Sequence, residues 1–362
     1  MTNRLKNEAN VRRAMQKQAI YFLSAACLTF GLHAADDQNE YGQYNSQQRV
    51  RPHHKEVKVT QKQRTDKCMN YYGYGAFTYW NGQVNDLTFL PVVELGDGQT
   101  VQHLIYQAKT RPGFKVGAGY YCNTNQFDTN VEYTWFYNEQ DKGEDKIALT
   151  TLTGDSTYLG KFKSAGGTLA NNFNRLDFTL NKLIFFHETF RITTGGGIVG
   201  SWSEFWENVL AKDNTESQPD SRIYVNNKIW GAGPYARVMS SFILPISAIP
   251  SWSHICLYMS AGTGFNWMNS KVSIQSTEPG GMLTFNFRDS LNNMRQLLDG
   301  RIGLRWEMMS NEYPVNAFVD IGWQVQNWGN LYRADYVTPL GLYTTSHDYF
   351  MQGLTATVGI DF

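Results

Sequence analysis

Apolar and polar residues alternate with a period of two along most of the chain from Tyr71 onward. In the run 315–325, for example, Ile321 and Trp323 fall on one face, whereas Asp320 and Gln324 fall on the other. Successive side chains of a β-strand point to opposite faces. Each alternating run therefore predicts a strand with one dry face and one wet face.

Ten such runs are separated by turn-rich segments, and the segment 270–290 has room for two more strands. The ten runs are 71–81, 113–122, 128–138, 174–182, 188–205, 223–239, 253–269, 294–309, 314–328 and 350–362. We therefore expect an all-β fold of about twelve strands, or ten strands if 270–290 forms a loop. Both numbers are even. In an antiparallel barrel an even number of strands puts the first and the last strand end on the same side of the membrane, the periplasmic side.

The dry face can be the core of a soluble sandwich or the lipid-facing wall of a transmembrane barrel. Aromatic residues near the ends of the runs favour the barrel, since amphipathic rings gather at the boundary between lipid and water. These aromatic residues are Tyr79, Trp80, Tyr120, Tyr121, Trp135, Phe136, Trp202, Trp206, Trp306, Trp323 and Trp328. A secreted all-β binding module, with the rings as stacking platforms for a ligand, is the soluble alternative.

The lengths of the gaps between runs also favour a transmembrane antiparallel β-barrel. Long gaps at 82–112, 139–173, 206–222 and 329–349 predict extracellular loops, and the short gaps between them predict periplasmic turns. The last run alternates strictly and ends on Phe362. This ending resembles the C-terminal signal that the barrel-assembly machinery of the bacterial outer membrane reads, so that machinery and outer-membrane lipid are expected partners.

The N-terminal segment predicts export from the cytoplasm. Basic residues, an apolar run at 19–32, small residues and then acidic residues follow one another in the order of a secretory signal peptide. The apolar run is too short to cross a bilayer as a helix. We expect a signal peptide at 1–34, a disordered periplasmic tail at 35–67 and the barrel at 68–362. A buried N-terminal helix is the alternative for the apolar run.

Charge and cysteine content narrow the possible partners. The chain has 32 basic and 32 acidic residues, so its formal net charge of zero does not suggest a nucleic-acid partner. Cys68 precedes the first run and Cys122 ends the second, which places both at the periplasmic side. An oxidising compartment would allow a disulfide between them, although the sequence leaves its geometry open. Cys256 is expected to be a free thiol on the lumen side.

Several strand and turn segments resemble one family. They are "TYWNGQVNDLTF" (78–89), 111–138, 175–204, 229–238, "LDGRIGLRWEM" (298–308) and "MQGLTATVGIDF" (351–362). Together they are similar to the Legionella-type pore-forming major outer-membrane proteins, which also occur in chlamydia-like bacteria. The resemblance implies an outer-membrane porin that passes small solutes passively, and it implies no catalytic residues. A surface protein acting in adhesion or in envelope structure is the alternative.

Charged residues on the wet faces are the candidates for lining a lumen, where fixed charges bias the entry of ions. They are Lys115, Glu132, Asp177, Arg191, Arg237, Arg301, Arg305, Glu307 and Asp320. Since both signs are present, we expect weak ion selectivity at most. The sequence predicts no catalytic residue, no metal site and no cofactor, and it leaves a homo-oligomer possible.

Overall fold

The computed structural model describes residues 70–84, 88–89, 104–105, 109–122, 126–144, 162–187, 189–213, 221–246, 253–277, 283–309, 316–338 and 341–361. All described residues belong to the compact unit Asp66–Phe362. The predicted signal peptide and tail therefore lie outside the described residues. Within the described part, no helix is long and apolar enough to cross a membrane.

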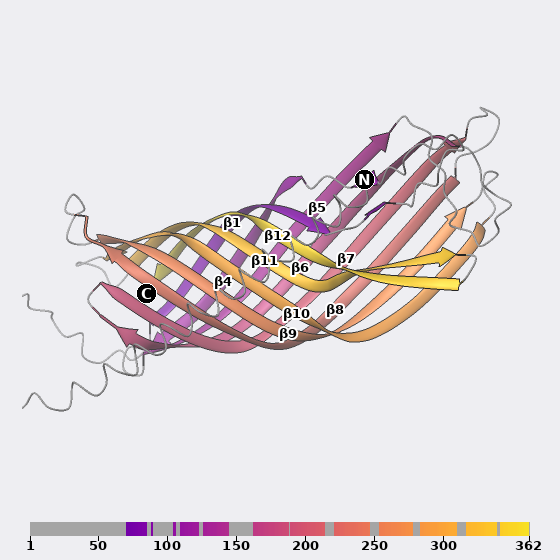
Figure 1. Cartoon of the computed structure of the whole chain (residues 1–362). Helices are drawn as coiled ribbons and strands as arrows, with labels where there is room; N and C mark the ends of the chain where they lie inside the picture. Colours follow the sequence, from indigo (N-terminus) through magenta and orange to yellow (C-terminus); the bar gives the residue numbers. More distant parts are fainter. Residues whose placement is uncertain are drawn as a thin grey trace, which may run out of the picture. The chain divides into compact units, whose positions relative to one another are not determined.

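Ten antiparallel strands close into a barrel in the order β1-β12-β11-β10-β9-β8-β7-β6-β5-β4 (Figure 1). Closure joins β1 to both β12 and β4, so no strand of the barrel is left as an edge. The strands are β1 (Asn70–Val84), β4 (Thr110–Cys122), β5 (Phe127–Glu144), β6 (Phe162–Phe186), β7 (Phe190–Asp213), β8 (Ser221–Leu244), β9 (Ser253–Thr277), β10 (Leu283–Met309), β11 (Asn316–Thr338) and β12 (Gly341–Asp361). A separate two-stranded sheet pairs β2 (Thr88–Phe89) with β3 (Leu104–Ile105).

The predicted antiparallel barrel is confirmed, with ten barrel strands rather than about twelve. The segment 270–290 adds no strand of its own. Its first part continues β9 to Thr277 and its second part begins β10 at Leu283. The two parts pair with each other, from Leu291 opposite Ser270 to Asn286 opposite Gln275.

The predicted extracellular loops were too long, because the strands extend far into them. The predicted loop 329–349 is mostly a hairpin, in which β11 and β12 pair out to Thr338 opposite Gly341. An irregularity at 329–331 marks the point where the alternation stops, and Asn330 there has a positive φ of 54°. Leu331, Tyr332 and Arg333, three successive residues after Asn330, are all buried, so pairing continues there without the alternation that would signal it in the sequence.

Large apolar side chains form a belt on the outer wall of the barrel. On β10 the exposed residues of this belt run from Met294 through Ile302 and Leu304 to Trp306. The twelve residue-to-residue steps from Met294 to Trp306, in a strand tilted at about 45°, rise roughly 28 Å along the barrel axis, close to the thickness of the apolar core of a bilayer. Only a closed barrel or a helix satisfies its backbone hydrogen bonds within lipid. We therefore assign the belt to the membrane.

The two ends of the barrel differ in how far the strands extend beyond the apolar belt. The segments 123–126, 187–189, 245–252 and 310–315 join strands at one end, where β1 also begins and β12 also ends. At the other end, several strands continue well beyond the apolar belt before they connect. Transmembrane barrels have short periplasmic turns and longer extracellular parts. The end at which the strands stop close to the belt is therefore the periplasmic end.

Placing a charge inside the belt should destabilise the barrel. Leu304→Arg is expected to lower the free energy of unfolding in phospholipid vesicles by about 2–4 kcal/mol, since it puts a guanidinium group into hydrocarbon. Ser290→Arg is the matched control on the same strand. Ser290 is exposed beyond Met294, and there the same side chain should cost only about 0–1 kcal/mol. Equal losses for the two variants would contradict the position of the belt.

Candidate functional site in the barrel interior

The structure places all nine predicted charged residues on the inner face of the barrel. Each alternates along its strand with outward-facing neighbours, as Arg305 does with the exposed Leu304 and Trp306. Three of the nine are buried, namely Lys115, Asp177 and Asp320. All of the nine except Arg191 and Arg237 belong to three bonded groups, which we call the charge layer.

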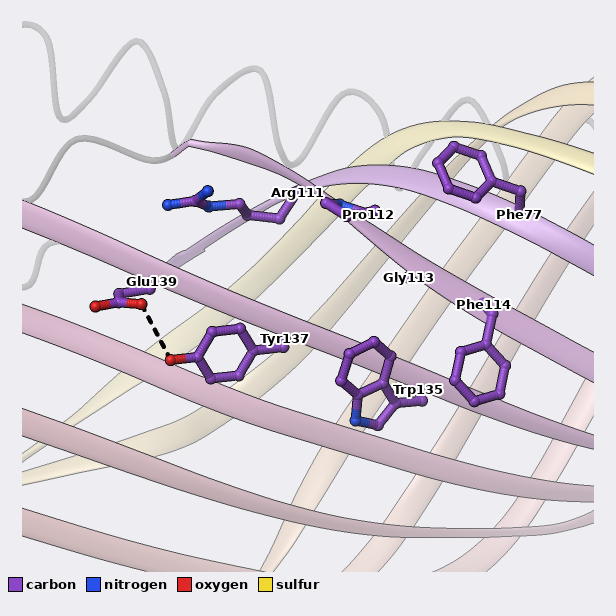
Figure 2. Close-up of a pocket in the computed structure, with 8 residues that line it drawn as sticks. All are labelled: Phe77, Arg111, Pro112, Gly113, Phe114, Trp135, Tyr137 and Glu139. Atoms are coloured by element: carbon purple, nitrogen blue, oxygen red, sulfur yellow. Dashed lines mark hydrogen bonds between the residues drawn. The ribbon is translucent and has the colours of Figure 1, made fainter.

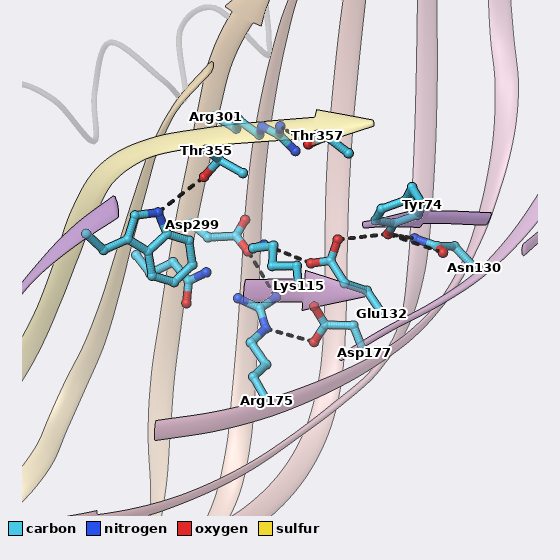
Figure 3. Close-up of polar contacts among 12 residues, drawn as sticks. Tyr74, Lys115, Asn130, Glu132, Arg175, Asp177, Asp299, Arg301, Thr355 and Thr357 are labelled. Atoms are coloured by element: carbon cyan, nitrogen blue, oxygen red, sulfur yellow. Dashed lines mark hydrogen bonds and ion pairs between the residues drawn. The ribbon is translucent and has the colours of Figure 1, made fainter. Parts of the chain in front are cut away.

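The first group lies on β1, β4 and β5 (Figure 3). Lys115 Nζ is 2.8 Å from Glu132 Oε1, and Tyr74 donates its hydroxyl hydrogen to Glu132 Oε2 at 2.8 Å. Asn130 in turn donates to the Tyr74 hydroxyl at 3.0 Å. The buried ammonium and the carboxylate thus neutralise each other, and the remaining carboxylate oxygen has a donor of its own.

The second group is centred on Arg175, which the sequence reasoning missed. Its guanidinium group donates to Asp177 Oδ1 at 2.8 Å and to Asp299 Oδ2 at 3.0 Å (Figure 3). Tyr235 donates to the other oxygen of Asp299 at 2.7 Å. Arg175 is on β6 and Asp299 is on β10, four strands apart around the barrel, so this ion pair spans the bore.

The third group is centred on Asp320, whose side chain is completely buried. Arg301 and Arg305 both donate to its carboxylate, the latter at 3.3 Å, and Tyr258 donates to it at 2.9 Å. Towards the periplasmic end of β10, His254 Nε2 is 2.7 Å from Glu307 Oε2, and it donates this hydrogen bond when the imidazole carries its proton on Nε2.

Two of the predicted arginines make their direct contacts, among the described residues, with neutral side chains. Arg237 donates to the amide oxygen of Asn181 at 2.9 Å. The guanidinium carbon of Arg191 lies 5.4 Å from the centroid of the Phe186 ring, at the periplasmic rim. Asn181 also donates to Asp128 at 2.8 Å, so its amide links Arg237 to this carboxylate.

A cluster of buried rings fills the bore on the extracellular side of the charge layer. We call it the aromatic layer, and its members are Trp80, Phe136, Phe173, Phe205, Trp328, Tyr332 and Tyr349. Phe173 on β6 is 5.6 Å from Trp328 on β11, and Phe205 on β7 is 5.3 Å from Tyr349 on β12, measured between ring centroids. Both pairs join strands that are five positions apart in a ring of ten. Rings from opposite walls therefore meet across the bore.

The aromatic layer corrects one prediction made from the sequence. Trp80, Phe136 and Trp328 were assigned to the boundary between lipid and water, but all three are at most 1 % exposed and lie inside the barrel. Neighbouring residues of a strand face opposite ways, so pairs such as Trp135 and Phe136 cannot both face lipid. By contrast, Trp202 and Trp306, like Tyr79 and Trp323, are exposed on the outer wall.

The outer wall carries a shallow hollow of about 450 Å³ over β1, β4 and β5 (Figure 2). Phe77, Phe114 and Trp135 line it, with Arg111 and Glu139 at its polar side. The pairing of β4 with β5 ends at Gly113 opposite Phe136, which leaves this part of the wall less filled. Because the lining is mostly apolar and faces the membrane belt, lipid chains suit it better than a water-soluble substrate.

The cysteine predictions have different outcomes. Cys122 is buried at the periplasmic end of β4, but Cys68 lies outside the described residues, so a disulfide between them stays a prediction. Cys256 is buried on the inner face, as the alternation of β9 predicted. Its sulfur and the side chains of His254 and Glu307 lie within 4.8 Å of one another.

A closed antiparallel barrel with an apolar outer belt and a hydrogen-bonded polar interior defines a transmembrane β-barrel protein. Residues 96–362 match the model of the family described as Legionella pneumophila major outer membrane protein precursor. The chain belongs to this family, as its strand and turn segments had indicated. It is therefore an outer-membrane protein.

Solved structures of other outer-membrane barrels are similar only at a general level. The outer membrane protease OmpT from Escherichia coli is 11% identical, with a TM-score of 0.42 and coverage of 81% of this chain and 96% of that chain. The Pseudomonas putida toluene transporter TodX is 7% identical, with a TM-score of 0.33 and coverage of 82% and 90%. A Pseudomonas aeruginosa FadL homologue is 7% identical, with a TM-score of 0.29 and coverage of 81% and 90%. No curated protein sequence matches the chain.

Proposed function

We propose that the protein is a porin of narrow bore that lets small hydrophilic solutes and ions cross the outer membrane passively. The observation that carries this proposal is the charged inner face of the barrel. Arg191 and Arg237 are partly exposed there, and each has a neutral partner among the described residues. A cation held inside a membrane protein without a carboxylate is costly unless water solvates it. Such arginines suit a hydrated path.

The aromatic layer sets the width of this path. Ten strands enclose a much narrower space than the sixteen to eighteen strands of porins with a wide aqueous channel. Since rings from opposite walls are in contact, only small ions and solutes would pass, and their passage would require motion of these rings. We therefore expect a conductance well below that of a wide general porin.

The acidic and basic residues named on the inner face are equal in number, so we expect a weak preference for anions only from the partly exposed Arg191 and Arg237. In planar bilayers with a salt gradient, the wild-type protein should give a reversal potential on the anion-selective side. Arg237→Gln should move this potential towards zero, since it removes a cation that is bonded only to an amide. Lys182→Gln is the matched control, because Lys182 is exposed on the outward face of β6 and should leave the potential unchanged.

Two outcomes would contradict the proposed porin function. If purified, folded protein forms no channels in planar bilayers, the barrel has no conducting path. A reversal potential that Arg237→Gln and Lys182→Gln shift equally would show that the inner face does not select ions. Heat-modifiable migration on gels verifies that each variant is folded.

A structural or adhesive role in the envelope is the second candidate function. The contact between Phe205 and Tyr349 across the bore favours it, since a permanently closed barrel would serve as a scaffold for its extracellular end. A strain lacking the protein separates the two functions. Slower uptake of small solutes with an intact envelope supports the porin, whereas leakage or loss of surface attachment with unchanged uptake supports the scaffold.

The proposal needs neither a catalytic residue nor a cofactor. It also includes insertion by the barrel-assembly machinery, which would read the C-terminal residue Phe362. Deleting this residue should reduce the amount of folded barrel in the outer membrane.

A homo-oligomer remains compatible with the proposal, and cross-linking in intact cells would detect it.

A further inference from the structure

Three basic side chains cluster on the outer wall of the barrel, where β8, β9 and β10 lie side by side (Figure 1). Lys228, Lys271 and Arg288 are all exposed and all point away from the bore. They border a shallow depression of about 730 Å³, which is also lined by the exposed Tyr224. We call these three residues the basic patch.

The register of the strands brings the positive charges close together. Lys228 on β8 is directly opposite Lys271 on β9, and like charges in this position destabilise a sheet. Arg288 on β10 is opposite Ser273, so it is the diagonal neighbour of Lys271. Long side chains reach one another over this diagonal distance. An anion bound between the three groups would relieve their repulsion.

Acidic neighbours neutralise the basic patch only in part. Glu204 Oε1 is 3.0 Å from Lys228 Nζ, and it also accepts a hydrogen bond from Asn226. Asp289 lines the same depression, but its carboxylate accepts a hydrogen bond from Arg333 on the inner face. The patch therefore keeps a positive excess.

The height of the basic patch in the membrane identifies its partner. Lys228 is two residues beyond Trp230, and Trp230 and Trp267 are 60 % and 64 % exposed at the extracellular edge of the apolar belt. Tryptophan rings prefer the level of the lipid headgroups. The basic patch thus lies directly beyond that level, where the phosphates of outer-leaflet lipids are found, and basic clusters beside the membrane bind such headgroups.

We propose that the basic patch binds the phosphate groups of a phosphorylated glycolipid of the outer leaflet, with the acyl chains packed along the belt below Trp230 and Trp267. Charge complementarity and the depth of the patch carry this assignment. It does not depend on whether the barrel conducts ions.

The test compares the binding of bisphosphorylated lipid A and its monophosphorylated form to the purified full-length protein in neutral detergent. Replacing all three cations, in K228Q/K271Q/R288Q, should weaken binding of the bisphosphorylated form by at least about tenfold, since each cation contributes a favourable electrostatic interaction. Lys182→Gln, which removes an exposed cation from the periplasmic part of β6, is the matched control and should bind as the wild type does.

Glu204→Gln gives a result that a folding defect cannot imitate. It frees Lys228 from its carboxylate partner and should make binding tighter. Preference for the bisphosphorylated lipid, loss in the triple variant and a gain in Glu204→Gln would support the site. Unchanged affinity in the triple variant would overturn it, as would equal weakening by Lys182→Gln. Displacement of the lipid by inorganic phosphate at a similar concentration would overturn it in favour of a free-phosphate site.

Discussion

Replacing Trp328 with alanine is expected to raise the single-channel conductance several-fold. Trp328 is completely buried, and its ring meets Phe173 of the opposite wall 5.6 Å away. Removing the indole opens a cavity in the narrowest section of the bore, where neighbouring rings relax only partly into the space. The conductance of single channels in planar bilayers measures this effect directly.

Trp323→Ala is the matched control for this prediction. Trp323 is on the same strand, β11, but it is 48 % exposed on the lipid-facing wall. Its removal should leave the conductance unchanged, although it weakens the contact with lipid. If Trp328→Ala folds and conducts as the wild type does, the aromatic layer does not limit the flow.

Replacing Arg175 with leucine is expected to destabilise the barrel strongly. The change leaves Asp177 and Asp299 buried without their common cation, and loss of one partner of a buried ion pair costs about 3–5 kcal/mol. Urea-induced unfolding in phospholipid vesicles, followed by tryptophan fluorescence, measures the change in the free energy of unfolding.

Two further variants show whether uncompensated charge causes that loss. Adding D177N and D299N to Arg175→Leu removes both orphaned carboxylates and should restore a large part of the stability. Arg288→Leu, an exposed arginine on the outer wall, should change the free energy by no more than about 0.5 kcal/mol. Failure of the triple variant to regain stability would contradict the electrostatic explanation.

The alternation of side chains placed the nine predicted charged residues on the inward side of their strands, as the structure does. On β10 the odd-numbered residues face the bore, among them Arg301, Arg305 and Glu307. The even-numbered residues face outward, among them the exposed Ile302 and Leu304. The lipid environment makes this signal strong, since an error of one residue would place every charge in hydrocarbon. The same logic could have found Arg175 and Asp299. Each lies two positions from a predicted residue of its own strand, Asp177 and Arg301, and therefore on the same inward face.

The contacts across the bore could not be predicted in this way. Arg175 and Asp299 are 124 positions apart in the sequence, and they meet only because closure sets β6 and β10 four strands apart. Periodicity specifies the face of a residue but not its partner on the far wall. For the same reason the sequence did not reveal that Phe205 and Tyr349 close the bore.

The ends of the strands were also beyond the reach of the pattern. Alternation of apolar and polar residues requires one wet face and one dry face, and this condition fails beyond Trp328, where Leu331, Tyr332 and Arg333 are all buried. The pairs from Tyr332 opposite His347 outward therefore lay in a region that the sequence predicted to be a loop. The backbone hydrogen bonds of these pairs do not depend on the type of side chain.

Two adjacent residues of β9 provide the most direct test of the central claim, that a polar bore runs inside a lipid-facing barrel. Ser260 faces the bore and Met259 is 51 % exposed on the outer wall. In protein whose native cysteines are replaced, Ser260→Cys should react with a small charged thiol reagent added to channels in planar bilayers, and the current should fall. Met259→Cys should react only with a lipid-soluble reagent and leave the current unchanged. Equal reaction of both positions with the charged reagent, or no change in current after complete labelling of Ser260→Cys, would contradict the claim.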